Sequence, residues 1–179
     1  TGRQLKGWTN KLIWGDNKFI LSSLKNGPLR TEVESNGGIK LIYIDPPFDV
    51  GADFSINVEI GAETFDKDPN VLEELAYRDT WGKGQDSYLS MIYERIRLMR
   101  DLLSNDGSLM FHCDYRVIGL CRVILDEIFG SGNLVNELIW VYRQGGRGEG
   151  AYGQKHDTIL WYRKGTEYTF NPDAVRIPY

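Results

Sequence analysis

The feature that most constrains the fold is IKLIYID, a near-continuous apolar run at residues 39–45. A run of this length without alternation predicts a strand that is buried on both faces of a parallel sheet. It is followed by an amphipathic helix predicted at 87–104 and by a second apolar strand predicted at 108–114. Strands that alternate with helices indicate an α/β domain with a mainly parallel sheet.

The rest of the pattern extends this order. We predict further strands at 11–16, 137–143 and 158–164, and further helices at 18–27 and 117–129. We expect Asn17 to cap the start of the helix at 18–27, and Asp86 or Ser87 to cap the start of the helix at 87–104. The ends of the three helices are expected at Gly27, at the stretch SNDG (104–107) and at Gly130. Residues 49–85 are predicted to be a long loop with one helical turn at 69–76. The last two strands have no helix between them, so they can be antiparallel.

Three carboxylates follow predicted strands. Asp16, Asp45 and Asp114 each stand at the carboxyl end of one. In open α/β sheets ligands bind beyond these ends, so the three residues predict a site at one edge of the sheet. For Asp16 and Asp114 a role as helix cap is an equally good interpretation.

The tetrapeptide Asp45-Pro46-Pro47-Phe48 has a chemistry of its own. Prolines lack a backbone N–H, so the Asp45 carboxylate and a nearby free carbonyl form a pair of acceptors with no donor between them. Such a pair fits an amino group on a heteroaromatic ring. Holding both hydrogens favours a pyramidal nitrogen, which stabilises nucleophilic attack more than the ground state. Phe48 can stack on the ring. The alternative is a strand-ending turn that contains two prolines.

Composition excludes other classes of protein. A chain of 179 residues suits one domain, and its longest apolar runs are too short to cross a bilayer. The N-terminal stretch is not a signal peptide. Cys113 and Cys121 cannot build a disulfide framework or a zinc site alone, and His112 and His156 form no recognisable motif. We predict a cytoplasmic protein with reduced thiols and no metal.

Charge is distributed unevenly. The net charge of −4 does not indicate a tight nucleic-acid binder as a whole, but residues 140–164 carry five basic and two acidic side chains. This segment is either a solvated surface or a patch for phosphates, with Arg143, Arg147 and Lys155 as the candidate DNA contacts. Its glycine-rich stretch, GGRGEG, opens no predicted helix and is interpreted as a loop.

Several motifs in order resemble the β-class amino-methyltransferases of DNA, which include the modification subunits of restriction systems. They are KLIWGDNKFILSSL, LIYIDPPFDVGADF, AYRDTW, YLSMIYERIRLMRDLLSNDGSLMFHCD, LDEIFGSGNLVNELIWVYRQGG and KHDTILWYRKG, and they cover nearly the whole chain. The resemblance implies S-adenosyl-L-methionine as methyl donor and a Rossmann-like, seven-stranded sheet with one antiparallel strand. It also implies a target base that is flipped out of double-stranded DNA.

The resemblance also implies roles for individual residues. The Asp form of the tetrapeptide is similar to that of adenine-specific members, whereas enzymes acting on the 4-amino group of cytosine more often carry Ser. Asp45 and the carbonyl of Pro46 would accept the two hydrogens of the 6-amino group of adenine, Pro47 would shape the turn and Phe48 would stack. Asp16 and Asp45 would lie near the cofactor. Asp49 stands where the family often has Asn, and it is assigned no role.

The chain departs from the family in one respect. Members carry a cofactor-binding strand and a Phe-x-Gly-x-Gly loop after the target-recognition region, and residues 1–179 contain neither. We therefore interpret residues 1–179 as the N-terminal part of a catalytic domain, in which the strand ending at Asp45 has an unpaired edge. Alone, this part should bind S-adenosylmethionine poorly.

Three functions stay open at this stage. The first is a site-specific adenine DNA methyltransferase in a bacterial or phage cytoplasm, partnered with a restriction subunit or a second methyltransferase chain and with no membrane. The others are a catalytically inactive nucleic-acid-binding module of the same fold, and methylation of amino groups in RNA.

Overall fold

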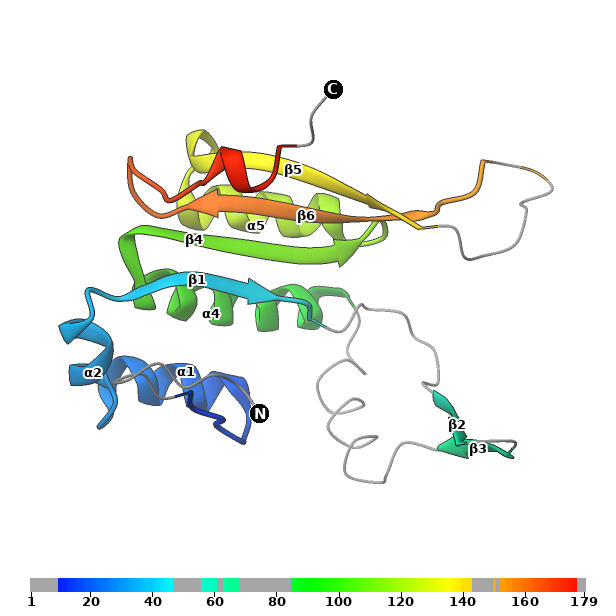
Figure 1. The fold of residues 1–179 in the computed structure, drawn as a ribbon, viewed down its shortest axis with the longest axis horizontal. Helices are drawn as coiled ribbons and strands as arrows, with labels where there is room; N and C mark the ends of the chain where they lie inside the picture. Colours follow the sequence, from blue (N-terminus) through cyan, green and yellow to red (C-terminus); the bar gives the residue numbers. More distant parts are fainter. Residues whose placement is uncertain are drawn as a thin grey trace.

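A computed structural model describes residues 10–46, 56–60, 63–67, 85–142, 150 and 152–176. Four strands form one sheet in the order β1-β4-β6-β5 (Figure 1). Their bounds are β1 (Ile39–Ile44), β4 (Leu103–Asp114), β5 (Leu134–Val141) and β6 (His156–Arg163). Short 3-10 helices lie at Ser131–Asn133 and Pro172–Ala174.

Strand direction matches the prediction. β1 pairs with β4 in parallel, and β6 is antiparallel to both of its neighbours, β4 and β5. Three strands of this sheet therefore run in one direction and β6 runs in the other. The predicted α/β class, with a mainly parallel sheet and one antiparallel strand, is confirmed.

Two helices cover one face of the sheet, namely α4 (Gln85–Leu102) and α5 (Ile118–Phe129) (Figure 1). Side chains alternate across a strand, so Leu109, Phe111 and Cys113 of β4 point toward these helices and join the buried core. Other members of this core come from both helices and from β6: Tyr88, Ile92, Ile96, Met99, Cys121, Leu125, Phe129, Leu160 and Tyr162. Gly130, with φ of 90°, ends α5 as predicted.

The first two helices lie beside α4. α1 (Asn17–Asn26) packs against it, and Lys18 on α1 forms an ion pair with Glu94 on α4 at 2.6 Å. The N-cap of α1 is Asp16, whose carboxylate accepts from the Lys18 amide, so the prediction of Asn17 as cap is wrong by one residue. Gly27 is the C-cap, as predicted. The short helix α2 (Arg30–Ser35) was not predicted.

Helix α4 corrects two further boundaries. Asp86 lies in its first turn and Ser87 inside it, so neither is its cap. The helix ends at Leu102 and the chain enters β4 at once, so SNDG belongs to the strand rather than to a terminating turn. Gly107 is still required, because a Cβ there would lie 2.7 Å from the carbonyl oxygen of Ile39 on the adjacent strand.

One predicted strand, at 11–16, and one predicted loop, at 49–85, are also revised. Residues 10–16 form no strand. Within the predicted loop 49–85, β2 (Ile56–Ile60) and β3 (Glu63–Lys67) pair as an antiparallel hairpin. The sequence INVEI alternates apolar and polar residues, which is a strand pattern. The helical turn predicted at 69–76 lies outside the described residues.

β1 differs from its prediction in burial. Among the described strands it is paired on one side only, by β4, and it stands at the edge of the sheet. Leu41 and Tyr43 are about half exposed, so the strand is not buried on both faces. The predicted unpaired edge is therefore present in the described part of the chain. No helix that the structure describes is long and apolar enough to cross a membrane.

Candidate active site at the carboxyl end of the sheet

Asp45 directly follows the last residue of β1, at the edge of the sheet where the parallel strands end. Its side chain is 51% exposed, and Pro46 after it is partly buried. Pro47 and Phe48 lie outside the described residues. The structure thus places the first half of the tetrapeptide at the edge predicted for a ligand.

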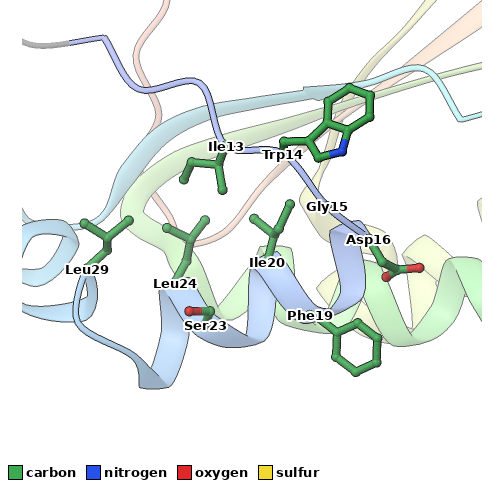
Figure 2. A pocket seen from close by; sticks show the side chains of 9 residues that line it. All are labelled: Ile13, Trp14, Gly15, Asp16, Phe19, Ile20, Ser23, Leu24 and Leu29. Atoms are coloured by element: carbon green, nitrogen blue, oxygen red, sulfur yellow. The ribbon is translucent and has the colours of Figure 1, made fainter.

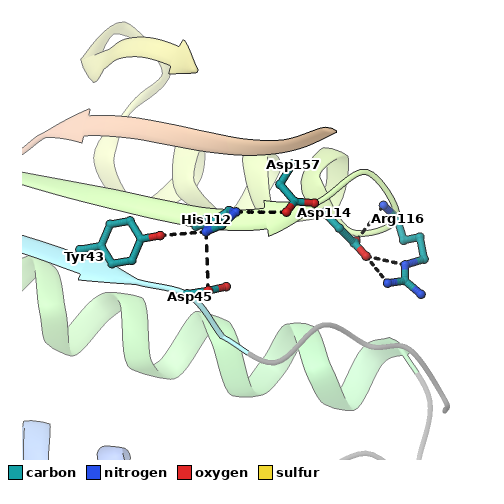
Figure 3. A network of polar contacts seen from close by, with 6 residues as sticks. All are labelled: Tyr43, Asp45, His112, Asp114, Arg116 and Asp157. Carbon is teal, nitrogen blue, oxygen red and sulfur yellow. Dashed lines mark hydrogen bonds and ion pairs between the residues drawn. The ribbon is translucent and has the colours of Figure 1, made fainter. Parts of the chain in front are cut away.

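His112 lies beside Asp45 (Figure 3). Its Nδ1 is 3.6 Å from Oδ2 of Asp45 and 2.8 Å from the hydroxyl oxygen of Tyr43. On the other side of the ring, Nε2 is 3.5 Å from Oδ2 of Asp157. The Trp140 ring is nearly parallel to the imidazole, at 15° with the centroids 6.3 Å apart.

Strand register explains this meeting. Ile44 of β1 pairs with Phe111 of β4, so Asp45 comes level with His112. On the other side of β4, His112 pairs with Ile159 and Asp114 with Asp157, so the start of β6 lies at the same edge. Tyr43 and His112 both point away from the helices, because their strand neighbours Ile44 and Phe111 pack into the core.

Tyr43 stays neutral in this group. Burial raises the pKa of its hydroxyl, and the negative charge of Asp45 raises it further. The hydroxyl therefore keeps its proton, and its oxygen makes the hydrogen bond to Nδ1 of His112.

The third predicted carboxylate, Asp114, is committed to another contact. It is buried at the end of β4, accepts from the Arg116 amide at 3.0 Å, and binds the Arg116 guanidinium (Figure 3). Asp114 raises the pKa of the guanidinium through this hydrogen bond and its charge. The N-cap of α5 is Val117, so the interpretation of Asp114 as a helix cap is wrong. Asp114 instead holds the turn that precedes the helix.

Asp16, as the cap of α1, also has a structural role. Arg95 of α4 reaches it, with Nη2 3.5 Å from Oδ1, and donates to the side chain of Asn17 and to the Met91 carbonyl.

An apolar pocket of about 260 Å³ adjoins Asp16 between α1 and the segment that precedes it (Figure 2). Ile13, Ile20 and Leu24 converge there, whereas Trp14 is 95% exposed.

A cavity beside Asp45 connects these elements. It has a volume of about 230 Å³ and lies between the end of β1, the start of α1 and one side of α4. Its polar lining consists of Asn17, Asp45 and Arg95, and its apolar lining of Ile44, Pro46, Met91, Ile92, Ile96 and Met99. The Arg95 side chain is 13% exposed. The cavity therefore combines an apolar wall with one guanidinium and one carboxylate residue.

The candidate DNA contacts are only partly visible. Lys155 lies just before β6, and its carbonyl accepts from the Tyr142 amide at 3.1 Å, so it is near the same edge. Arg143 and Arg147 lie outside the described residues.

Comparison with known proteins identifies the family. The family model for DNA methylases of the N6/N4 type matches residues 39–179. The chain belongs to the DNA methylase family.

Relatives of this DNA methylase come from restriction-modification systems. The type II methyltransferase M.EcaI of Enterobacter cloacae is 31% identical over 172 residues, covering 92% of this chain and 32% of the relative. The Mod subunit of the type III enzyme EcoP15I of Escherichia coli is 31% identical over 141 residues, covering 72% of this chain and 20% of the relative. The chain thus spans a third or less of the length of these relatives.

Solved structures confirm the fold. The M1.HpyAVI–SAM complex aligns with a TM-score of 0.51 at 16% identity, over 94% of this chain and 60% of that one. TTHA0409 of Thermus thermophilus aligns with a TM-score of 0.50 at 14% identity, over 92% of this chain and 58% of that one.

The sequence analysis missed three residues that lie around Asp45. His112 and Asp157 belong to no local motif, and they meet Asp45 only through strand register. Arg95 is one of several charged residues on an amphipathic helix. The position of His112 two residues before Asp114, at a strand end, was the one available signal.

Proposed function

We propose that this chain carries the amino-group site of an S-adenosylmethionine-dependent DNA methyltransferase that acts on the 6-amino group of adenine in double-stranded DNA. The observation that carries the proposal is the placement of Asp45 and Pro46 at the carboxyl end of β1, half exposed and beside a cavity. The family and the relatives from restriction-modification systems support the same function.

The two acceptors act on the target nitrogen. The Asp45 carboxylate takes one hydrogen of the amino group, and the carbonyl of Pro46 takes the other. Residues 46 and 47 are both prolines, so no backbone N–H of theirs competes for these acceptors. Holding both hydrogens directs the nitrogen lone pair out of the ring and lowers the barrier to attack. Phe48 is proposed to stack on the base, and Pro47 to shape the turn.

The cavity beside Asp45 fits part of the cofactor. S-Adenosylmethionine, when bound, supplies the electrophilic methyl group. Arg95 would hold its carboxylate, and Asp45, with Asp16 close to Arg95, would face its positive charges. We propose that residues outside 1–179 complete the cofactor and target-recognition contacts, which leaves this chain the N-terminal part of the domain.

Partners follow from the same proposal. Double-stranded DNA would pass near the segment that contains Arg143, Arg147 and Lys155. Relatives that are Mod subunits of type III enzymes support a restriction subunit as a further partner.

The test compares Asp45→Asn with the unaltered complete protein. Each is incubated with S-adenosylmethionine and either unmethylated genomic DNA or RNA, the nucleosides are analysed by mass spectrometry, and DNA binding is measured by titration. We expect N6-methyladenine from the unaltered protein and a loss of about 100-fold or more in the variant, comparable to the loss of a key transition-state contact. N4-methylcytosine as the product would refute the adenine assignment. Product on RNA alone would favour RNA methylation, and DNA binding without product would favour an inactive binding module.

A further inference from the structure

We propose that His112 is a positioning residue that fixes the carboxylate of Asp45, and that Asp157 holds His112 in place. The inference rests on the role proposed above for Asp45. It assigns a task to a histidine and an aspartate that come from the second and third strands of the sheet.

Asp45 needs a group that holds its carboxylate. It lies beyond the last residue of β1, and half of its side chain faces solvent. A carboxylate at a turn is often fixed by the amides that follow it, but the next two residues are prolines and offer none. A displacement of about 1 Å in a reacting group costs about 100-fold in rate. The orientation of Asp45 therefore has a direct effect on turnover.

His112 is placed to supply this support. Its Nδ1 is 3.6 Å from Oδ2 of Asp45, which leaves Oδ1 for the amino group of the base. The ring comes from β4, which is paired on both sides, by β1 and β6. Its side chain is only 13% exposed, so the imidazole has a more rigid base than the edge residue it contacts.

The ring itself is held from three strands. Tyr43 of β1 is hydrogen-bonded to Nδ1 at 2.8 Å, and Asp157 of β6 lies 3.5 Å from Nε2 (Figure 3). Trp140 of β5 stacks on its face. The proposed role requires a proton on each ring nitrogen: Nδ1–H then donates to the Tyr43 oxygen and faces Oδ2 of Asp45, and Nε2–H faces Oδ2 of Asp157. These contacts fix both the position and the rotation of the ring.

The experiment uses the complete protein with three variants. His112→Leu removes both ring nitrogens, and His112→Asn keeps an amide where Nδ1 lies. The control is His156→Asn, since His156 is the other histidine of the chain and neighbours Asp157 on the opposite face of β6. For each protein we measure kcat for methyl transfer, the Kd for S-adenosylmethionine and the melting temperature.

A positioning role predicts a split between these readouts. His112→Leu should lower kcat about 10- to 100-fold while Kd changes less than about threefold. The kcat of His112→Asn should be about tenfold higher than that of His112→Leu. The kcat of His156→Asn should stay within about twofold of that of the unaltered protein. An unchanged kcat in His112→Leu would overturn the proposal. A loss of kcat accompanied by a comparable fold-loss of cofactor affinity and by a lowered melting temperature would also overturn it, because this result would show a purely structural role.

The double variant Asp45→Asn/His112→Leu separates this inference from the proposed function. If His112 acts through Asp45, the double variant should be no slower than Asp45→Asn alone. If Asp45→Asn keeps full turnover, the proposed role of Asp45 fails first. If Asp45→Asn is inactive while His112→Leu is fully active, only the positioning role of His112 is refuted.

Discussion

Replacing Ile96 by Ala tests whether α4 forms the wall of the site as well as the core. Ile96 is fully buried, belongs to the core cluster and also lines the cavity beside Asp45. The three carbons lost, at about 0.8 kcal/mol each, give roughly 2.4 kcal/mol of lost transfer free energy. A void adds up to about 24 cal/mol per Å³, but here it merges with an existing open cavity, so this addition should be small. The better helix propensity of Ala returns a few tenths of a kcal/mol.

We therefore expect Ile96→Ala to lower the free energy of opening of α4 by about 2–3 kcal/mol. Native-state hydrogen exchange of the α4 and β4 amides in the complete protein measures this quantity. Ile96→Val, expected to cost about 1 kcal/mol, is the matched control, and Arg97→Ala, on the exposed side of α4, should cost less than about 0.5 kcal/mol. A cost for Ile96→Ala below about 1 kcal/mol would refute the packing described for this helix.

Two further predictions concern polar groups that are buried or partly buried. Tyr162→Phe removes a hydrogen bond of 2.5 Å from the Tyr162 hydroxyl to Oδ1 of Asp126, and should lower the free energy of unfolding by about 1.5–3 kcal/mol in urea titrations. Burial lowers the pKa of Lys164, whose Nζ donates to the Leu103 carbonyl at 2.6 Å. The unfolded state then binds more protons at alkaline pH, so stability should rise with pH between the folded and unfolded pKa values of Lys164. The stability difference from Lys164→Met should show this slope, and a flat difference would contradict it.

Local patterns were enough to predict some elements of the fold. α5 was predicted from a glycine stop and from apolar residues that recur at helical spacing, namely Val117, Leu120, Cys121, Ile124 and Ile128. The residues that the helix itself buries are Cys121, Leu125 and Phe129. β1 was placed correctly, but its burial was not, since burial depends on which strands pair with its edge. The hairpin of β2 and β3 was missed because a composition rich in Gly, Asp and Asn outweighed a short alternating pattern.

The candidate site was predictable only where it is local. Asp45 and Pro46 stand in a contiguous motif, so their chemistry could be argued from neighbouring residues. His112 and Asp157 lie 67 and 112 positions further along the chain and contact the site through the register of two strand pairs. Register depends on tertiary pairing, which a single sequence does not specify.

The direction of β6 explains why the usual rule for ligand sites in α/β sheets does not predict Asp157. Ligand sites of α/β sheets are sought at the carboxyl ends of strands, where Asp45 follows β1 and Asp114 is the last residue of β4. A single reversed strand brings its amino end to that same edge, so β6 contributes Asp157, near its start, rather than a residue near its end. The Asp–His–Asp arrangement thus needs both kinds of pairing at once: parallel, to bring His112 level with Asp45, and antiparallel, to bring Asp157 to the other nitrogen of the same ring. A sheet with all strands parallel would place the residue after β6 there instead, and the contact to Nε2 would have to come from a loop.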